Sequence, residues 1–483
     1  MQSGATQADT GFRSTVTLPV AGAGAGCATD TDPANAAEML RDELRRRLAP
    51  RPLGDLDGLT LARLVTRDVR WNGTHHLDPR TVAGLAAVRD RCAGRDPMLD
   101  AFLDCVLAKH DGRYWNRTYL CLPVLERLVD GPDAPLGPVA LAALLAADIV
   151  RYELCASHRG KAISPLDRPD GRTLRTRVRH AARFEAANLG AEHATELLAA
   201  VAHDPEATLS ELLASLPVPP APWAADWLEV SVQPVSTVHD EYFFIRALQA
   251  HEMMYTVAGR RIADAATALV EGQPERAARR VDHARVMVER GQSLFRMVAT
   301  MRYEAFHTFR EFTQGASAIQ SEQYKRFESR CWTPSPDRLA SPAFESVPAV
   351  RVELAEEHIT LMDAWLAADR RRPRDPALAR VATSMAALEA AHRRWKGTHL
   401  TVATRMLGSA RGSGDTSGVP YLQSWVEHRL FGDCPAVRAQ GIPERADGHV
   451  CDEAAAEIPV PRSGDEPPVD VAAGQSLSRL SRQ

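Results

Sequence analysis

Helical periodicity is the feature that most constrains the fold of this chain. In the segment AAEMLRDELRRRL, which begins at Ala36, the residues Met39, Leu40, Leu44 and Leu48 share one face and charged residues occupy the opposite face. Similar patterns recur along the chain, and few segments alternate apolar and polar residues with the period of two that a half-buried strand requires. The sequence therefore predicts an all-α protein.

Changes in composition divide the chain into five parts. Residues 1–35 are rich in Gly, Ala, Thr and Ser without a sustained apolar period, and we expect them to be disordered. Residues 36–216 form a predicted helical domain of unknown role, and the Pro-rich stretch 217–223 predicts a stiff linker because proline fixes φ. Residues 224–441 form a second predicted helical domain. Residues 442–483 are acidic and rich in Pro and Ser, which predicts a disordered tail.

Charge and hydropathy argue against two classes of partner. The net charge of −4 gives no reason to expect nucleic acid. The longest apolar run, Leu136–Val150, is too short to span a bilayer and contains Asp148, so no membrane segment is predicted. The eight cysteines are scattered without a CxxC or a Cys/His cluster, and the N-terminus lacks a secretory pattern. We therefore expect no structural zinc and a reducing, cytoplasmic location.

Three blocks carry the strongest functional signal. They are HDEYFFIRALQAHEMMY (His239–Tyr255), FHTFREFTQGASAIQSEQYKRFE (Phe306–Glu328) and HRRWKGTHLTVATRMLGSARGSGDTSGVPYLQ (His392–Gln423). Their order and approximate spacing resemble the tryptophan 2,3-dioxygenase family, from near Trp223 to about Arg438. The resemblance implies a helical domain that binds haem b and acts on an aromatic amino acid with dioxygen.

His399 lies in RRWKGTHLTVATRML, where the apolar spacing predicts an amphipathic helix. A lone histidine on such a helix is more often a packed or solvated residue than a ligand. The resemblance implies that His399 is the proximal axial ligand of the haem iron. A neutral imidazole on a rigid helix suits that position and leaves the opposite one open for dioxygen.

Arg310 lies among Phe306, Phe309 and Phe312, an apolar setting in which a guanidinium needs an anionic partner. A structural ion pair would satisfy that need. The resemblance implies instead that Arg310 binds the carboxylate of the substrate, a task that suits the planar arginine side chain.

The glycine-rich segment Gly408–Gly418 lacks the Gly-Lys-Ser/Thr ending of a phosphate-binding loop. It could be a plain flexible connection. The resemblance implies a loop that closes over the bound amino acid, with Ser413 where the family has threonine. The hydroxyl is retained, so a contact with the substrate's ammonium or carboxylate group remains open to it.

The departures from the family concern the distal side of the pocket. Leu248 occupies the position of a histidine that faces the indole N–H, and leucine can neither accept a hydrogen bond nor take a proton. The related indoleamine 2,3-dioxygenases also lack that histidine. Phe306 replaces a tyrosine, and Phe244 matches the aromatic residue that packs on the indole. His251, three residues after Leu248, would either replace part of the missing group or pack elsewhere.

Trp227 lies near the point where the family has a tyrosine that a neighbouring subunit contributes to the pocket. The resemblance therefore implies a homo-oligomer with shared sites. The domain predicted for residues 36–216 has no place in the family's usual plan, so the assembly could differ.

The resemblance implies a haem-dependent dioxygenase that converts L-tryptophan, or a closely related indole amino acid, to N-formylkynurenine by inserting dioxygen across the indole C2–C3 bond. The substituted pocket leaves a monooxygenase of a modified tryptophan or another aromatic amino acid as an alternative. A haem-binding sensor and a helical interaction protein without haem are further alternatives. Arg310 and Ser413 favour an enzyme, because a gas sensor needs no carboxylate-binding arginine, and His399 argues against loss of haem.

Overall fold

The computed structural model describes residues 18–19, 33–50, 57–110, 115–130, 134–158, 168–189, 209–313, 315–356, 358–413 and 416–440. These residues form helices joined by turns, and no β-strand occurs among them. The all-α prediction is confirmed. Nearly all of the predicted disordered segments 1–35 and 442–483 lies outside the described residues, although the first helix already begins at Pro33.

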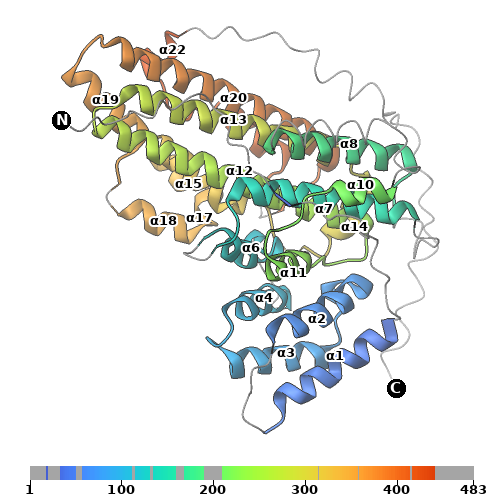
Figure 1. Ribbon diagram of the computed structural model, residues 1–483. Helices are drawn as coiled ribbons and strands as arrows, with labels where there is room; N and C mark the ends of the chain where they lie inside the picture. Colours follow the sequence, from blue (N-terminus) through green and yellow to red (C-terminus); the bar gives the residue numbers. More distant parts are fainter. Residues whose placement is uncertain are drawn as a thin grey trace, which may run out of the picture. The chain divides into compact units, whose positions relative to one another are not determined.

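Four helices at the start of the chain pack on one another in a small bundle (Figure 1). They are α1 (Pro33–Leu48), α2 (Gly58–Asn72), α3 (Pro79–Cys92) and α4 (Pro97–Leu107). Three of them begin at an aspartate, because Asp57, Asp78 and Asp96 each accept a hydrogen bond from a backbone amide of the first turn. The short helices η1 (Thr74–His76) and η2 (Ala108–His110) follow α2 and α4.

The next part of the chain leads into the main body of the protein. It contains α5 (Asn116–Tyr119), α6 (Leu122–Val129), α7 (Pro138–His158), α8 (Gly171–Asn188), α10 (Leu209–Ser215) and α11 (Pro222–Val230). The helices α7 and α8 pack against each other and against the long helices that follow.

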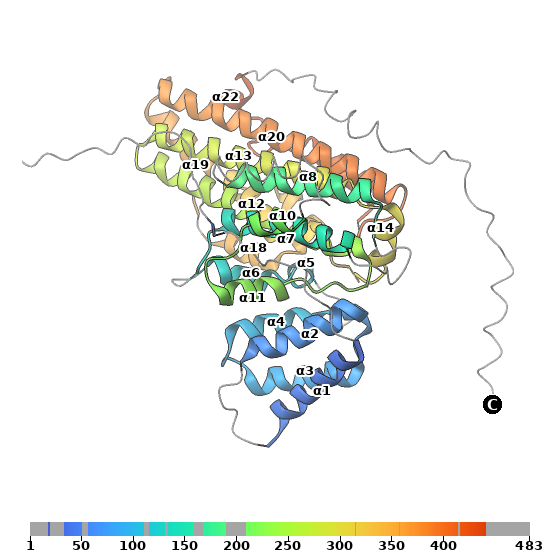
Figure 2. The same ribbon diagram turned by 45° about the vertical axis from the view of Figure 1, so that its right-hand side comes forward.

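Three long helices lie side by side and form the centre of the protein (Figures 1 and 2). They are α12 (His239–Val270), α13 (Pro274–Val298) and α20 (Pro376–Leu407). Most residues of α12 are buried, since α7, α13, α15 and α19 cover it on several sides.

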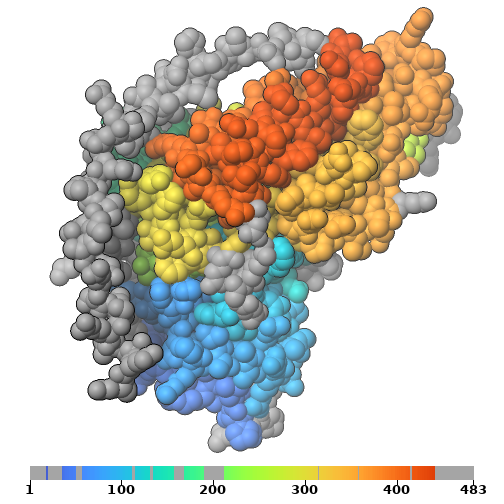
Figure 3. Space-filling model, turned by 180° about the vertical axis from the view of Figure 1, so that it is seen from behind, coloured from blue at the N-terminus to red at the C-terminus, as the bar shows by residue number. Residues whose placement is uncertain are grey.

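Shorter helices complete the fold around this centre. They are α14 (Tyr303–Arg310), η3 (Ala318–Gln320), α15 (Glu322–Cys331), α16 (Pro336–Leu339), α17 (Pro342–Glu345), α18 (Pro348–Ala355), α19 (Leu361–Arg371), α21 (Val419–Val426) and α22 (Pro435–Arg438). Seen from behind, the yellow segment around α14 borders the orange-red segment that follows α20 (Figure 3).

Residues 1–442 group into one compact unit by their contacts, and the second unit, residues 443–483, lies outside the described residues. Within the first unit, α7 and α8 from the predicted first domain pack directly against α12 and α13 from the predicted second domain. The linker at 217–223 and the division into two domains stay predictions. No helix in the described part of the chain is both long and apolar enough to cross a membrane.

A buried ionic network joins α7, α8 and the start of α12. The Arg177 guanidinium, which is 0% exposed, donates to Glu153 Oε1 at 3.0 Å and lies 3.0 Å from Asp240 Oδ2. Glu153 Oε2 lies 2.8 Å from His239 Nε2. Burial alone would raise the pKa of Glu153, but His239 and Arg177 outweigh it and lower this pKa. His239, the first residue of the first block, therefore belongs to this network.

We expect Arg177→Met to lower the free energy of unfolding by about 3–5 kcal/mol, because Glu153 and Asp240 lose the buried cation that they share and keep only His239 and Arg302 as partners. The lowered pKa values of Glu153 and Asp240 mean that the network stabilises at neutral pH and that this contribution is lost as the pH falls through those lowered values. Urea unfolding measures the change. As a control, Arg63→Met removes an ion pair with Asp226 near the surface and should cost less than about 1 kcal/mol. Equal, small losses in both variants would contradict the assigned role of the network.

Candidate functional site

A cavity of about 280 Å³ lies between α12, α13, α14, α15, α20 and the segment that follows α20. Six of the seven residues that the sequence singled out line it: Phe244, Leu248, Phe306, Arg310, His399 and Ser413. They come from three separate blocks of sequence, so the fold brings together side chains that lie far apart along the chain.

Trp227 is the predicted residue that does not line this cavity. Its side chain is 6% exposed, and its ring centroid lies 6.4 Å from that of Phe102 in the core. A side chain so enclosed within its own subunit has little surface to offer a neighbouring pocket. The structure therefore lends no support to the predicted contribution of Trp227 across a subunit interface.

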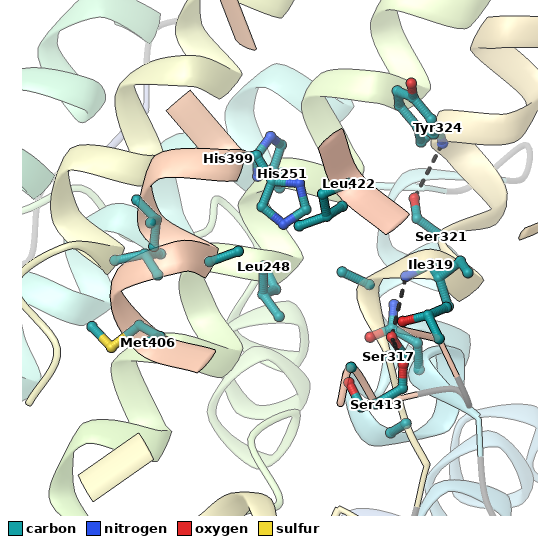
Figure 4. Close-up of a pocket in the computed structure, with 18 of the residues that line it drawn as sticks. Leu248, His251, Ser317, Ile319, Ser321, Tyr324, His399, Met406, Ser413 and Leu422 are labelled. Atoms are coloured by element: carbon teal, nitrogen blue, oxygen red, sulfur yellow. Dashed lines mark hydrogen bonds between the residues drawn. The ribbon is translucent and has the colours of Figure 1, made fainter. Parts of the chain in front are cut away.

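His399 projects from α20 into the wall of the cavity (Figure 4). Its ring stacks on Phe295, with centroids 5.1 Å apart and planes at 7°, and a tilted contact joins it to Trp395 at 5.8 Å. No hydrogen bond to its ring nitrogens occurs among the described residues. Burial lowers the pKa of His399 to about 4, so the imidazole is neutral at pH 7. A neutral imidazole with a free nitrogen is the form that binds a metal ion.

His251 lies close to His399, and both rings contact Phe295 and Trp395. Trp395 Nε1 donates a hydrogen bond of 2.7 Å to His251 Nε2, which places the proton of the neutral ring on Nδ1. Burial, followed by the neighbouring His399, lowers the pKa of His251 to about 3. A Cβ at Gly291 would lie 3.2 Å from His251 Nε2, so glycine leaves the ring its space. His251 lines the cavity, but its acceptor nitrogen is already occupied.

Arg310 ends α14 and lies against the segment that follows α20. Its Nη2 donates to the carbonyl of Arg411, and its guanidinium lies 5.8 Å from the centroid of the Phe306 ring. Partial burial lowers its pKa. No carboxylate in the described part of the chain pairs with Arg310. The guanidinium is therefore available for an anionic group of a ligand.

The loop after α20 closes the same side of the cavity. The Ser317 hydroxyl donates to the Ser413 carbonyl at 2.9 Å, which joins this loop to η3. Gly418 has φ +73°, and a Cβ there would lie 2.5 Å from the Ala410 carbonyl oxygen. A larger residue at Gly418 would not fit this turn. Figure 4 shows Ser317 and Ser413 together, with Leu248 between them and the two histidines.

The cavity also contains a cluster of buried cations that sequence reasoning missed. Lys325, which is 3% exposed, places its Nζ 4.5 Å from the centroid of the Tyr324 ring and makes no hydrogen bond to a described residue. Arg338 donates from Nε and Nη2 to the two oxygens of Glu328 at 2.7 and 2.8 Å, while its buried Nη1 has no partner. Both cations flank the Phe344 ring, at 5.7 and 5.5 Å. One carboxylate thus faces two positive charges.

Sequence patterns gave little reason to expect this cluster. Lys325 belongs to the second block, but a lysine on an amphipathic helix normally extends into solvent. Arg338 comes from a separate short helix, and its meeting with α15 depends on tertiary packing. Asn116, Tyr119 and Leu120 also line the cavity, although they belong to the part of the chain without an assigned role.

The chain is similar to tryptophan 2,3-dioxygenases. It is 26% identical to the enzyme of Ruegeria sp. TM1040 over 230 residues, which are 41% of this chain and 82% of the relative. It is 26% identical to that of Erythrobacter litoralis over 248 residues, covering 44% and 94%, and 27% identical to that of Ruegeria pomeroyi over 242 residues, covering 43% and 86%. No family model matches the chain. These similarities support an oxygenase of this type, and they leave more than half of the chain without a counterpart.

Burial and the neighbouring Arg338 lower the pKa of Lys325 to about 7, so the unfolded chain holds a proton that the folded protein loses between pH 7 and about 10. The free energy of unfolding should therefore rise with pH across that range. We expect Lys325→Met to raise the free energy of unfolding at pH 7 by on the order of 1–4 kcal/mol, with a gain that shrinks towards pH 10. Denaturant unfolding at several pH values measures this. A loss of stability in Lys325→Met would show that its ammonium has a partner.

Proposed function

We propose that this protein is a haem-dependent oxygenase of L-tryptophan or a closely related indole amino acid. The observation that carries the proposal is the meeting of His399 and Arg310 in one cavity. Among the described residues, the neutral imidazole has no hydrogen-bond partner and the guanidinium has no carboxylate partner. The similarity to tryptophan 2,3-dioxygenases supports the substrate class and the use of dioxygen. We propose insertion of both oxygen atoms across the indole C2–C3 bond, which gives N-formylkynurenine.

The residues of the cavity fit haem b. His399 would supply a nitrogen ligand to the iron, and Phe295 and Trp395 hold its ring in place. Lys325 and Arg338 would bind the carboxylates that haem b carries, and Arg338 Nη1, which is buried without a partner among the described residues, would then be satisfied. When bound, haem b supplies an iron that binds and activates dioxygen.

The remaining wall would bind and orient the substrate. Phe244, Leu248 and Phe306 provide an apolar surface for the indole ring, and Arg310 would bind the α-carboxylate. Ser413 and the loop around it would cover the amino-acid group and exclude water. Holding the indole in one orientation next to the activated oxygen is the main contribution of these side chains.

Neither Leu248 nor His251 offers a base to the substrate. Leu248 has no polar atom, and the acceptor nitrogen of His251 is bonded to Trp395. Neither side chain can therefore remove the proton from the indole N–H. The same apolar wall favours an alternative, the insertion of a single oxygen atom into a modified tryptophan or another aromatic amino acid. Arg310, which pairs with no described carboxylate, favours a dioxygenase or a monooxygenase over a haem-binding sensor. The homo-oligomer and the cytoplasmic location stay predictions.

We expect His399→Ala to lose most of its haem, or to show an absorption spectrum that no longer indicates a histidine ligand, because His399 is the histidine of α20 that lines the cavity. Haem content per chain and the Soret band measure this. His358→Ala, at an exposed position outside the cavity, is the matched control and should keep both unchanged. Equal haem content and identical spectra in the two variants would rule out His399 as the ligand.

Arg310→Ala should lower kcat/KM for tryptophan by at least about tenfold, because a charge-assisted hydrogen bond contributes roughly 1.5–3 kcal/mol. Arg310→Lys should recover part of this loss, since a lysine keeps the charge without the planar geometry. Tryptamine, which lacks the carboxylate, serves as the control substrate. Its turnover should change far less. If tryptophan and tryptamine respond equally to Arg310→Ala, the arginine does not bind the carboxylate.

A further inference from the structure

The helix α5 comes from the part of the chain for which the resemblance implies no role, yet it forms one wall of the cavity. Asn116, Tyr119 and Leu120 all line the cavity from this helix and the residue after it. Each is almost fully buried, with 3%, 2% and 1% of its surface exposed. The wall is therefore an integral part of the protein interior.

Three hydrogen bonds hold this wall against the elements that carry the predicted site. The Asn116 backbone amide donates to Gln320 Oε1 at 2.8 Å, and Gln249 Nε2 on α12 donates to the Leu120 carbonyl at 2.8 Å. The Tyr119 hydroxyl donates to Glu241 Oε1 at 3.2 Å. Because these bonds are buried, breaking one costs more than an exposed bond would, and α5 has a defined position relative to Leu248.

The Asn116 backbone amide is hydrogen-bonded, whereas its side-chain carboxamide makes no hydrogen bond to any described residue. The residue is 3% exposed and lines the cavity, so a ligand in the cavity would supply the partner that no described residue provides. Gln320 Oε1, which holds the Asn116 backbone, also accepts from the Ser317 amide at 3.2 Å, and Ser317 is bonded to Ser413. Asn116 therefore lies on the polar side of the cavity, next to the loop that would cover an amino-acid group.

We propose that α5 completes the substrate pocket within a single chain, and that the Asn116 carboxamide oxygen accepts a hydrogen bond from the ammonium group of the bound amino acid. The identity of the ligand rests on the proposed function. Arg310 can bind the carboxylate but repels an ammonium, whereas a carboxamide oxygen is a suitable acceptor for it. Arg310 and Asn116 together would select an α-amino acid over a simple indole acid.

The test measures tryptophan binding to the haem-loaded protein by absorbance titration. Asn116→Ala should raise the Kd for tryptophan roughly tenfold and leave the Kd for indole-3-propionate, which lacks the ammonium, unchanged. Asn116→Asp keeps an acceptor oxygen and should keep the affinity for tryptophan. Since the carboxamide makes no hydrogen bond to a described residue, Asn116→Ala should not lower the melting temperature. Asn72→Ala, outside the cavity, is the control.

Equal affinity for tryptophan in the unaltered protein and in Asn116→Ala would overturn the assignment of Asn116, while the proposed function would stand. An unaltered protein that binds haem but not tryptophan would instead contradict the proposed function.

A second measurement tests whether α5 forms a wall of the cavity. Binding of the apolar dye 8-anilinonaphthalene-1-sulfonate should fall in Leu120→Trp, which fills the cavity from α5, and persist in Leu120→Ala and in the control Leu59→Trp. Unchanged dye binding in folded Leu120→Trp would contradict the proposal that α5 forms a wall of the cavity.

Discussion

The position of α12 depends on charges that are neutralised inside the protein. This helix of 32 residues is covered by neighbours on several sides, so the charged side chains at its start cannot reach solvent. Arg177 pairs with both Glu153 and Asp240, and Glu153 also contacts His239, so these contacts join α7 and α8 to the start of α12. Because α12 also carries Leu248 and His251, the geometry of the cavity depends on a network that lies outside it.

The cavity combines an apolar middle with polar groups whose hydrogen-bonding capacity the described residues use only in part. Arg338 Nη1 is buried without a partner among them, and Arg310 bonds a backbone carbonyl but no described carboxylate. Lys325 and Asn116 also line the cavity. Buried polar groups in folded proteins are normally paired, so such groups around one cavity indicate ligands with complementary groups. A cofactor with two carboxylates and a zwitterionic amino acid would together provide such groups, and that shared requirement links the cofactor proposal to the substrate proposal.

Local patterns predicted the helices, because apolar periodicity acts within one element, and the three sequence blocks supplied six residues that do meet in the cavity. The rest depends on distant packing. Lys325 would have been taken for a solvated lysine. Arg338 meets Glu328 on another helix, and Asn116 meets Gln320, which is far away in sequence. Trp227 does not line the cavity of its own chain and packs against Phe102, and its contribution to a neighbouring subunit stays a prediction. The sequence left open whether His251 replaces part of the missing distal group or packs elsewhere. Its hydrogen bond to Trp395 places it in the wall of the cavity.

The most direct test of this account is the mass of the product formed from L-tryptophan by the haem-loaded protein under isotopically labelled dioxygen. The account predicts N-formylkynurenine that carries two labelled oxygen atoms, with no such product from His399→Ala. A product with one labelled atom would replace the dioxygenase proposal with the monooxygenase alternative. Haem-loaded protein that leaves tryptophan and related aromatic amino acids unchanged would contradict the central claim that this cavity is the active site of an oxygenase.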